Sequence, residues 1–235
     1  MAGLIVALDL PSSEKALRLV DMLGEDVQRY KVGSPLFTRV GPRLIEELHQ
    51  RGKSVFLDLK FHDIPNSVAR AVESAAELQV DMLTLHASGG LDMLAAAREA
   101  AGDDGPRLLG VTLLTSFTAA DVEQVWAKDL RSLREEVSRL AGLAADAGLQ
   151  GVVASALEVE VLKRKHGAGF MVVTPGIRPA GDLEGDQVRI ATPAVAVRNG
   201  SDFVVVGRPI LAAPDPVAAT AAILAELKEA MEAIV

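Results

Sequence analysis

Three ionic side chains, Asp58, Lys60 and Asp63, follow closely on one another where the apolar pattern of residues 54–65 ends. Side chains alternate across a strand, so Phe56, Asp58 and Lys60 are expected to share one face. A carboxylate and an ammonium two residues apart at the end of a strand are costly to desolvate unless each has partners. The spacing therefore indicates a catalytic or binding site rather than an ordinary strand end.

The scaffold for such a cluster is a regular alternation of strand and helix patterns. Short apolar or β-branched runs predict eight strands, at residues 4–9, 30–32, 55–60, 82–86, 108–114, 151–154, 170–174 and 203–207. Between them, apolar residues recur at helical spacing, as in Leu133, Val137 and Leu140. Eight alternating units in 235 residues predict an α/β fold, a (β/α)8 TIM barrel forming a single domain over residues 1–235. An open doubly wound sheet is the alternative, but no Gly-x-Gly-x-x-Gly motif follows the first strand.

Polar residues gather at the predicted carboxyl ends of these strands, where barrels of this kind place their chemistry. They are Asp9, Lys31, Asp58, Lys60, His86, Thr115, Ser116 and Ser155. Strands seven and eight are each followed by a turn that combines glycine with arginine, namely Gly176 with Arg178 and Gly207 with Arg208. Glycine lets backbone N–H groups approach a ligand closely and arginine offers a forked donor, so the two turns predict a phosphate site. The irregular stretch 175–187 is too long for an ordinary connection and predicts a lid on the phosphate side.

Composition narrows the class of protein. The formal net charge of −8 and the lack of a basic stripe argue against general nucleic-acid binding. The chain has no cysteine, which excludes disulfides and thiolate metal sites or nucleophiles. No stretch reaches the roughly 18 to 20 apolar residues that a membrane span needs, and no signal peptide is recognisable. We therefore expect a cytoplasmic protein that binds neither nucleic acid nor membrane.

Six separated motifs carry a resemblance to a known family. They are Ala7-Leu8-Asp9, Lys31-Val32-Gly33, Asp58-x-Lys60-x-x-Asp63-Ile64-Pro65-Asn66, Thr174-Pro175-Gly176-Ile177-Arg178, Asp186-Gln187 and Val205-Val206-Gly207-Arg208-Pro209-Ile210. In these residues and their order, the chain resembles the orotidine 5'-phosphate decarboxylase family in its bacterial form, over nearly its whole length. It departs from the family at Ser67, where threonine is usual, and at Gly185, where an acid is common.

The resemblance implies a carbon–carbon lyase, a carboxy-lyase that converts orotidine 5'-monophosphate to UMP and CO₂ in pyrimidine biosynthesis, without metal or other cofactor. It further implies that Lys31, Asp58, Lys60 and Asp63 form a charged tetrad in which Lys60 donates the proton. Asp63 would come from the neighbouring subunit, with Ile64 and Ser67 also pointing into the partner's site. This arrangement requires a homodimer with active sites shared across the interface.

The remaining site residues that the resemblance implies bind the rest of the substrate. Asp9 and Lys31 would hold the ribose hydroxyls, Thr115 the ribose region across the interface, and Ser155 the pyrimidine edge. The phosphate would be held by Arg178, Gln187, Gly207 and Arg208, with Gln187 also reaching the base from the lid.

Two other functions are compatible with the barrel. One is an Mg²⁺-dependent sugar-phosphate decarboxylase or aldolase of the same barrel superfamily, which would need an acidic cluster near the first strand, where only Asp9 stands. The other is a catalytically inactive barrel that binds a nucleotide, because fold alone does not fix function.

Overall fold

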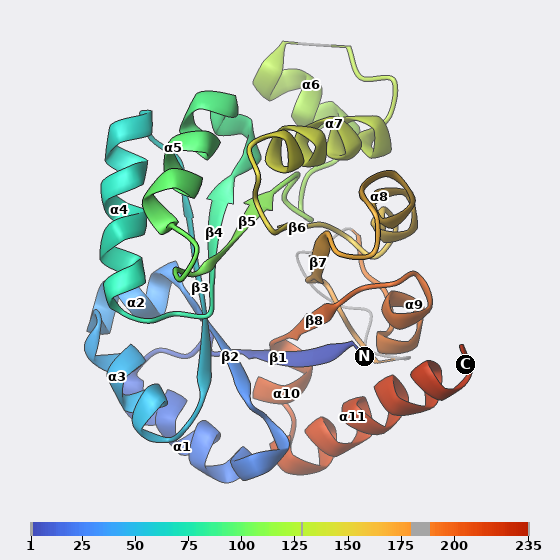
Figure 1. Ribbon diagram of the computed structural model, residues 1–235. Helices are drawn as coiled ribbons and strands as arrows, with labels where there is room; N and C mark the ends of the chain where they lie inside the picture. The colour runs from blue at the N-terminus through green and yellow to red at the C-terminus, as the bar shows by residue number, and fades with distance from the viewer. Residues whose placement is uncertain (1, 128, 180–188, 235) are drawn as a thin grey trace.

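The computed structural model describes residues 2–127, 129–179 and 189–234, and it confirms the predicted (β/α)8 barrel. The strands pair in parallel and in chain order, and β8 closes onto β1 (Figure 1). Their bounds are β1 (Gly3–Ala7), β2 (Arg29–Gly33), β3 (Ser54–Phe61), β4 (Met82–His86), β5 (Arg107–Val111), β6 (Gly151–Val153), β7 (Met171–Thr174) and β8 (Phe203–Val206). Each of the eight predicted strands is present.

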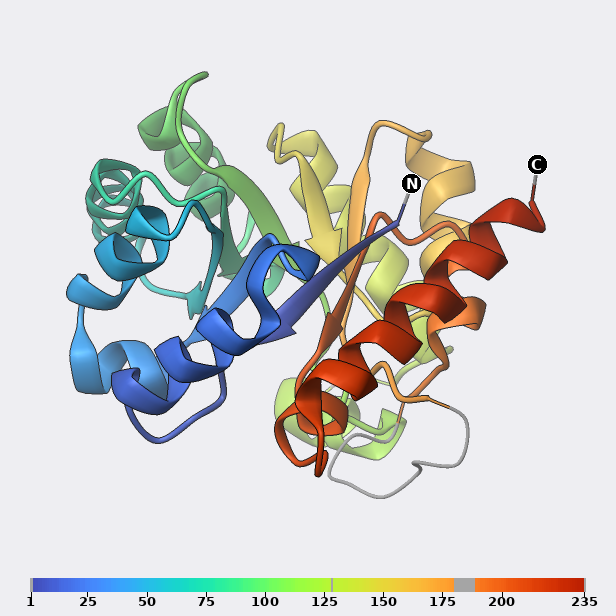
Figure 2. The ribbon, with the colours of Figure 1, turned by 90° about the horizontal axis from the view of Figure 1, so that it is seen from below.

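Helices form a ring outside the strands (Figure 1). In the described residues they are α1 (Ser13–Leu23), α2 (Ser34–Val40), α3 (Arg43–Gln50), α4 (Pro65–Glu77), α5 (Leu91–Ala101), α6 (Ala119–Trp126), α7 (Leu133–Asp146), α8 (Val159–His166), α9 (Pro193–Arg198), α10 (Arg208–Leu211) and α11 (Pro216–Glu232). Short 3₁₀ helices follow α1, at Gly24–Asp26, and β4, at Ala87–Gly89. The last helix, α11, packs against α9 and α1 and ends on the side of the barrel where β1 begins (Figure 2).

Two apolar layers hold the barrel together. The larger layer lies between strands and helices and includes every second residue of β1, such as Leu4 and Val6. The smaller layer fills the barrel interior with the side chains that point inward, and its members are Ile5, Ala7, Phe56, Met82, Leu109, Val173 and Val205. Because side chains alternate along each strand, one strand serves both layers. The interior is thus a packed floor beneath the polar residues at the strand ends.

Two strands end two or more residues earlier than the sequence predicts. β1 ends at Ala7, so Asp9 lies two residues beyond the strand rather than at its end. β5 ends at Val111 because its neighbour β6 is only three residues long and their pairing stops at Val153. Thr115 therefore lies in the connection that follows β5, beyond the residues of that strand that pair in the sheet.

Candidate active site

A cavity of about 340 Å³ opens at the carboxyl ends of the strands, as the barrel fold predicts. Its floor includes Ala7, Phe56 and Val205 of the interior layer. Eight of the predicted site residues line it: Asp9, Lys31, Asp58, Lys60, Thr115, Arg178, Gly207 and Arg208. An apolar floor with a rim of ions suits a ligand that has a planar base and a charged tail.

The charged side chains of β1–β3 form one connected cluster. The Nζ of Lys60 donates to Asp58 Oδ1 at 2.7 Å. The Nζ of Lys31 lies 3.5 Å from Asp58 Oδ2 and 3.0 Å from Asp9 Oδ1. Asp58 is 8% exposed, whereas Asp9 is open to solvent. The structure thus brings together Asp9, Lys31, Asp58 and Lys60, four of the polar residues predicted at the strand ends.

Thr84 of β4 belongs to this cluster but was missed by the sequence analysis. Its hydroxyl donates to Asp58 Oδ1 at 2.9 Å and accepts the backbone N–H of Lys60 at 2.9 Å. Thr84 is fully buried. A threonine in a strand is ordinary in sequence, so only the pairing of β3 with β4 reveals this contact.

The backbone of Lys60 is left-handed, with φ of 52°. The register of β3 against β4 shifts between Leu57 and Phe61, around this residue. The predicted strict alternation therefore fails at Lys60, although its side chain still reaches Asp58 and lines the cavity with Phe56. A non-glycine residue in this conformation costs about 1–3 kcal/mol, and such residues cluster at active sites.

The protonation of Asp58 follows from its partners. Burial alone would raise the pKa of this carboxyl, but the adjacent ammonium groups of Lys31 and Lys60, with hydrogen bonds from Lys60 and Thr84, outweigh burial and lower it below the ordinary value. Asp58 is therefore a carboxylate at neutral pH. The cavity holds a fixed negative charge between two cations.

Gly33, at the end of β2, makes room for this cluster. A Cβ placed there would lie 3.0 Å from the Nζ of Lys31 and 3.4 Å from Asp9 Oδ1. The glycine thus permits the close approach of Lys31 and Asp9 beside the backbone.

The two glycine-arginine turns follow β7 and β8, and Gly207 lies beside Asp9, since β8 pairs with β1. Gly176 has φ of 77°, a conformation that favours glycine. Arg178 is 5% exposed and its backbone N–H donates to Ala191 O at 2.9 Å, while Arg208 stands exposed at the rim after β8. Both arginines and both glycines border the same cavity, where the sequence predicts a phosphate site.

Five predicted residues lie outside this cavity wall or outside the description. Asp63, Ile64 and Ser67 are exposed at the start of α4 and do not line the cavity of their own chain. The carboxylate of Asp63 accepts the N–H of Ile64 at 2.6 Å. Residues 180–187 of the predicted lid, which include Gln187, lie outside the described residues.

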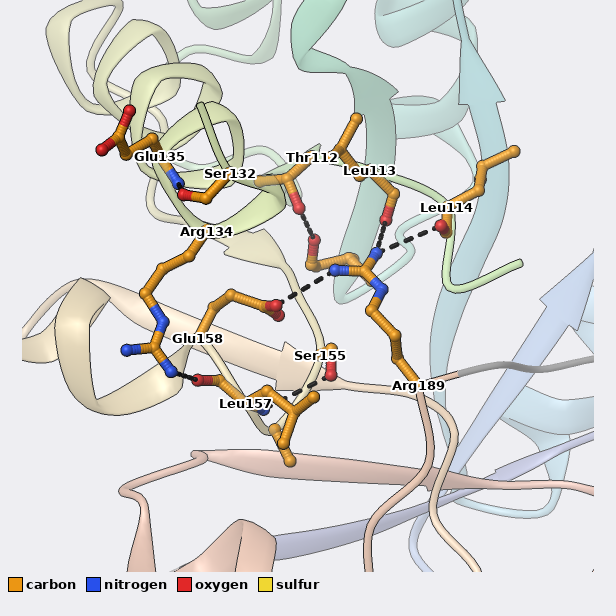
Figure 3. Close-up of polar contacts among 12 residues, drawn as sticks. Thr112, Leu113, Leu114, Ser132, Arg134, Glu135, Ser155, Leu157, Glu158 and Arg189 are labelled. Carbon is orange, nitrogen blue, oxygen red and sulfur yellow. Dashed lines mark hydrogen bonds and ion pairs between the residues drawn. The ribbon is translucent and has the colours of Figure 1, made fainter. Parts of the chain in front are cut away.

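Ser155 also does not line the cavity. It is 2% exposed, and its hydroxyl accepts the N–H of Leu157 at 3.3 Å (Figure 3). Its assignment to the pyrimidine edge stays a prediction. His86, noted at the end of the fourth strand, packs 5.5 Å from the ring of His62, and burial lowers its pKa.

A second buried ion pair, Glu158 with Arg189, was also missed by the sequence analysis. Glu158 is 4% and Arg189 7% exposed, and Arg189 Nη1 lies 3.1 Å from Glu158 Oε1 (Figure 3). The partners are 31 residues apart, in two connections of irregular structure. No local spacing in the sequence marks such a pair.

Two findings bear on partners and cofactors. Among the residues that the structure describes, no three histidine, aspartate or glutamate side chains gather so as to hold a metal ion. None of the described helices is both long enough and apolar enough to cross a membrane.

Comparison with known proteins agrees with the geometry of this site. The sequence profile of a family described as "Orotidine 5'-phosphate decarboxylase / HUMPS family" matches residues 2–223. A protein named orotidine 5'-phosphate decarboxylase from Halorhodospira halophila is 54% identical over 229 residues, which is 97% of this chain and 96% of that protein. The protein of that name from Legionella pneumophila (strain Corby) is 51% identical over 227 residues, or 95% of this chain and 98% of that one.

A solved structure extends the likeness to three dimensions. The crystal structure of orotidine 5'-phosphate decarboxylase from Lactobacillus acidophilus superposes with a TM-score of 0.84 at 39% identity, covering 97% of this chain and 99% of that chain. The profile and the relatives each cover almost the whole barrel, including the charged cluster and both glycine-arginine turns. This chain belongs to the orotidine 5'-phosphate decarboxylase / HUMPS family.

Proposed function

We propose that this chain is a carboxy-lyase that converts orotidine 5'-monophosphate to UMP and CO₂, a step of pyrimidine biosynthesis. One observation carries the proposal: the Lys60 ammonium, 2.7 Å from Asp58, enters the same cavity as the arginine turns at Arg178 and Arg208. The site thus offers a fixed proton donor and a phosphate site in one cavity. Relatives at 51% and 54% identity carry the name of this activity.

The reaction requires electrostatic stabilisation of the negative charge that develops on C6 of the pyrimidine. The bond between C6 of the pyrimidine and the carboxylate carbon breaks, CO₂ leaves, and the electron pair stays on C6 in the plane of the ring. No ring carbonyl is placed to delocalise that pair. An ammonium fixed beside C6 stabilises the developing charge and then transfers its proton to C6 to complete UMP. Lys60 is the residue that we assign to this role.

The neighbours of Lys60 hold it in place for this step. Asp58 lies between Lys31 and Lys60. Because it is a carboxylate at neutral pH, it attracts both ammonium groups. Thr84 fixes both Asp58 and the backbone of Lys60. The charges are therefore oriented before substrate arrives, which avoids reorganisation during the reaction.

We assign the rest of the cavity to the ribose and phosphate. Asp9 and Lys31 would bind ribose hydroxyls, and their mutual contact of 3.0 Å supports a joint role. Arg178, Gly207 and Arg208 would bind the phosphate, because backbone N–H groups beside glycine and arginine forks are suited to it. Thr115, Ser155 and Gln187 keep the roles that the family resemblance gives them.

The protein acts, in this proposal, as a cytoplasmic homodimer whose sites are shared. Asp63, Ile64 and Ser67 are exposed and stand away from the cavity of their own chain. Ile64 is 66% exposed, although it is a large apolar residue. An exposed apolar side chain between an acid and a hydroxyl supports insertion of this segment into a partner subunit.

Mixing two inactive variants tests the shared site. Asp63→Ala and Lys60→Ala proteins are each expected to be inactive, but a mixed dimer contains one site with both groups intact. Free exchange of subunits should restore about a quarter of the wild-type activity. If tagged pull-down verifies subunit exchange and yet no activity is recovered, Asp63 acts in the site of its own chain.

The activity itself is tested by incubation with orotidine 5'-monophosphate and EDTA, following the loss of orotate absorbance. Turnover that chelator does not affect is the expected result. Turnover of a sugar phosphate that requires added Mg²⁺ would instead favour the aldolase-type alternative. Tight binding of UMP with no turnover of either substrate would favour an inactive nucleotide-binding barrel.

A further inference from the structure

Arg189 is a buried guanidinium outside the charged cluster of β1–β4. Its Nη1 donates to Glu158 Oε1 at 3.1 Å, and its Nη2 donates to the backbone carbonyls of Leu113 and Leu114, each at 3.1 Å (Figure 3). A buried cation is destabilising unless it is paired and hydrogen-bonded. The planar fork of arginine meets that need here with acceptors from two separate segments.

The acceptors belong to the wall of the cavity that follows β5 and β6. Leu113 and Leu114 line the cavity directly before Thr115. Glu158 follows Ser155 in the connection after β6. Arg189 thus ties the chain segment that precedes α9 to the ends of two other strands.

That same segment is paired with the turn that carries Arg178. Ala191, two residues after Arg189, donates its N–H to Gly176 O at 3.1 Å and accepts the N–H of Arg178 at 2.9 Å. Ile177 and Ala191 form a parallel bridge between them. The position of the Gly176–Arg178 turn relative to Leu113 and Leu114 is therefore linked to the contacts of Arg189.

We propose that Arg189 and Glu158 form a positioning pair, which holds the Gly176–Arg178 turn at the place where it binds the substrate phosphate. The inference rests on the proposed function, because it names a phosphate-bearing ligand. Neither residue lines the cavity, so both act through the backbone of residues that do. A pair that served stability alone would leave phosphate affinity unchanged once stability had been restored.

Apolar replacement of the pair separates these two roles. Arg189→Met and Glu158→Leu each leave a buried polar partner alone, and both should lower the melting temperature. The double variant removes the unpaired charge and should regain part of the lost melting temperature, since the carbonyls of Leu113 and Leu114 still lack their donor. Its KM for orotidine 5'-monophosphate and its Kd for UMP should still be raised by about 10- to 100-fold, because nothing then ties Ala191 to Leu113 and Leu114.

A conservative variant covers the case in which the double variant does not fold. Arg189→Lys keeps a positive charge beside Glu158, but a single ammonium lacks the planar fork that serves all three acceptors. We expect a folded protein whose KM and UMP Kd are raised in the same direction by a smaller factor. Wild-type KM and Kd in both Arg189→Lys and the double variant would overturn the positioning role.

Arg164→Met is the matched control. Arg164 forms an exposed pair with Glu160 at 3.2 Å on α8, away from the cavity, so its loss should change neither melting temperature nor KM. Calorimetric measurement of the Kd for UMP does not require turnover, so it separates failure of the positioning pair from failure of the decarboxylase activity. A wild-type protein without turnover refutes the decarboxylase activity, whereas an active wild type and double variant with equal KM refute only the positioning pair.

Discussion

The half of the barrel formed by β1–β4, here the charged half, fixes its ions through contacts between side chains on neighbouring strands. Lys31, Asp58, Lys60 and Thr84 meet directly, at distances from 2.7 to 3.5 Å. In the half formed by β5–β8, here the phosphate half, the turns are held by backbone pairing and by Arg189, which does not line the cavity. The contrast suggests a division of labour, in which the charged half performs the chemical step and the phosphate half supplies binding.

The largest expected effect is in the charged half. Lys60→Ala removes both the proton donor and the cation beside C6, so kcat should fall by about 10⁴-fold or more. Alanine keeps a Cβ and therefore the strain of the left-handed backbone, and Asp58 keeps Lys31 and Thr84 as partners, so the melting temperature should stay near that of the wild type. Single-turnover decarboxylation and thermal unfolding by circular dichroism measure the two effects.

Lys228→Ala, at an exposed position of α11, is the control for loss of a lysine. It should match the wild type in both measurements. A kcat for Lys60→Ala within tenfold of the wild type would remove Lys60 from the acid role and erase the contrast between the halves.

The next effect lies in the phosphate half. Arg208→Ala removes one charge-assisted hydrogen bond to the phosphate, worth about 1.5–3 kcal/mol, and should raise KM by about 10- to 100-fold. Arg198→Ala, exposed on α9 and outside the cavity wall, is the matched control and should leave KM unchanged. Steady-state kinetics distinguish the expected rise in KM from a fall in kcat at saturating substrate. A loss confined to kcat would mean that the phosphate half takes part in the chemical step.

A smaller effect tests how the charged half is held. Thr84→Val keeps the shape of the side chain but removes the donor to Asp58 and the acceptor for the N–H of Lys60. The free energy of unfolding should fall by about 1–3 kcal/mol, and kcat by about tenfold. Urea unfolding and steady-state kinetics measure these changes. Thr84→Ser keeps the hydroxyl and should retain most of both, so losses in Thr84→Ser as large as those in Thr84→Val would show that the hydroxyl alone does not account for the role of Thr84.

Sequence alone predicted the charged half well, because its signals are local. Asp58 and Lys60 are two residues apart on one strand, and the strand order of a barrel brings Lys31 and Asp9 beside them. The glycine-arginine turns were also predictable, since each is a short motif that follows a strand. The eight strands followed from their apolar runs, although the ends of β1 and β5 depend on how far their neighbours extend.

The parts that could not be predicted depend on contacts between distant segments. Thr84 is one of eight threonines in the chain, and its role arises from the register shift of β3 against β4. Glu158 and Arg189 read as ordinary surface charges until the connections after β6 and β7 are placed together. Spacing in a sequence shows which residues share a strand face, but not which irregular connections meet.

Each half also contains a buried carboxyl whose pKa is shifted, and the two shifts have opposite directions. In Asp58, the nearby lysines outweigh burial and lower the pKa. In Glu158, burial outweighs Arg189 and raises the pKa above the ordinary value of 4.5. The two groups therefore shift stability with pH in opposite senses.

The smallest predicted effect follows from these directions. Ionised Asp58 stabilises the fold above its ordinary pKa of 3.8, and this contribution is lost as pH falls below 3.8 through the folded-state value. Glu158 behaves in the reverse way, because its contribution is complete below pH 4.5 and is lost as pH rises through its higher folded-state value. Each change is limited to about 1.4 kcal/mol per pH unit for one proton.

Urea unfolding at a series of pH values, for wild type, Asp58→Asn and Glu158→Gln, tests both signs in one experiment. The stability difference between wild type and Asp58→Asn should be level above pH 3.8 and shrink below it. The wild type should lose stability relative to Glu158→Gln as pH rises above 4.5. The result against this prediction is that the stability differences from wild type change with pH in the same way for both variants. The lysines of the charged half and Arg189 of the phosphate half would then compensate burial to the same degree. In that case the two halves would hold their ions by one electrostatic balance, and the contrast between them would rest on geometry alone.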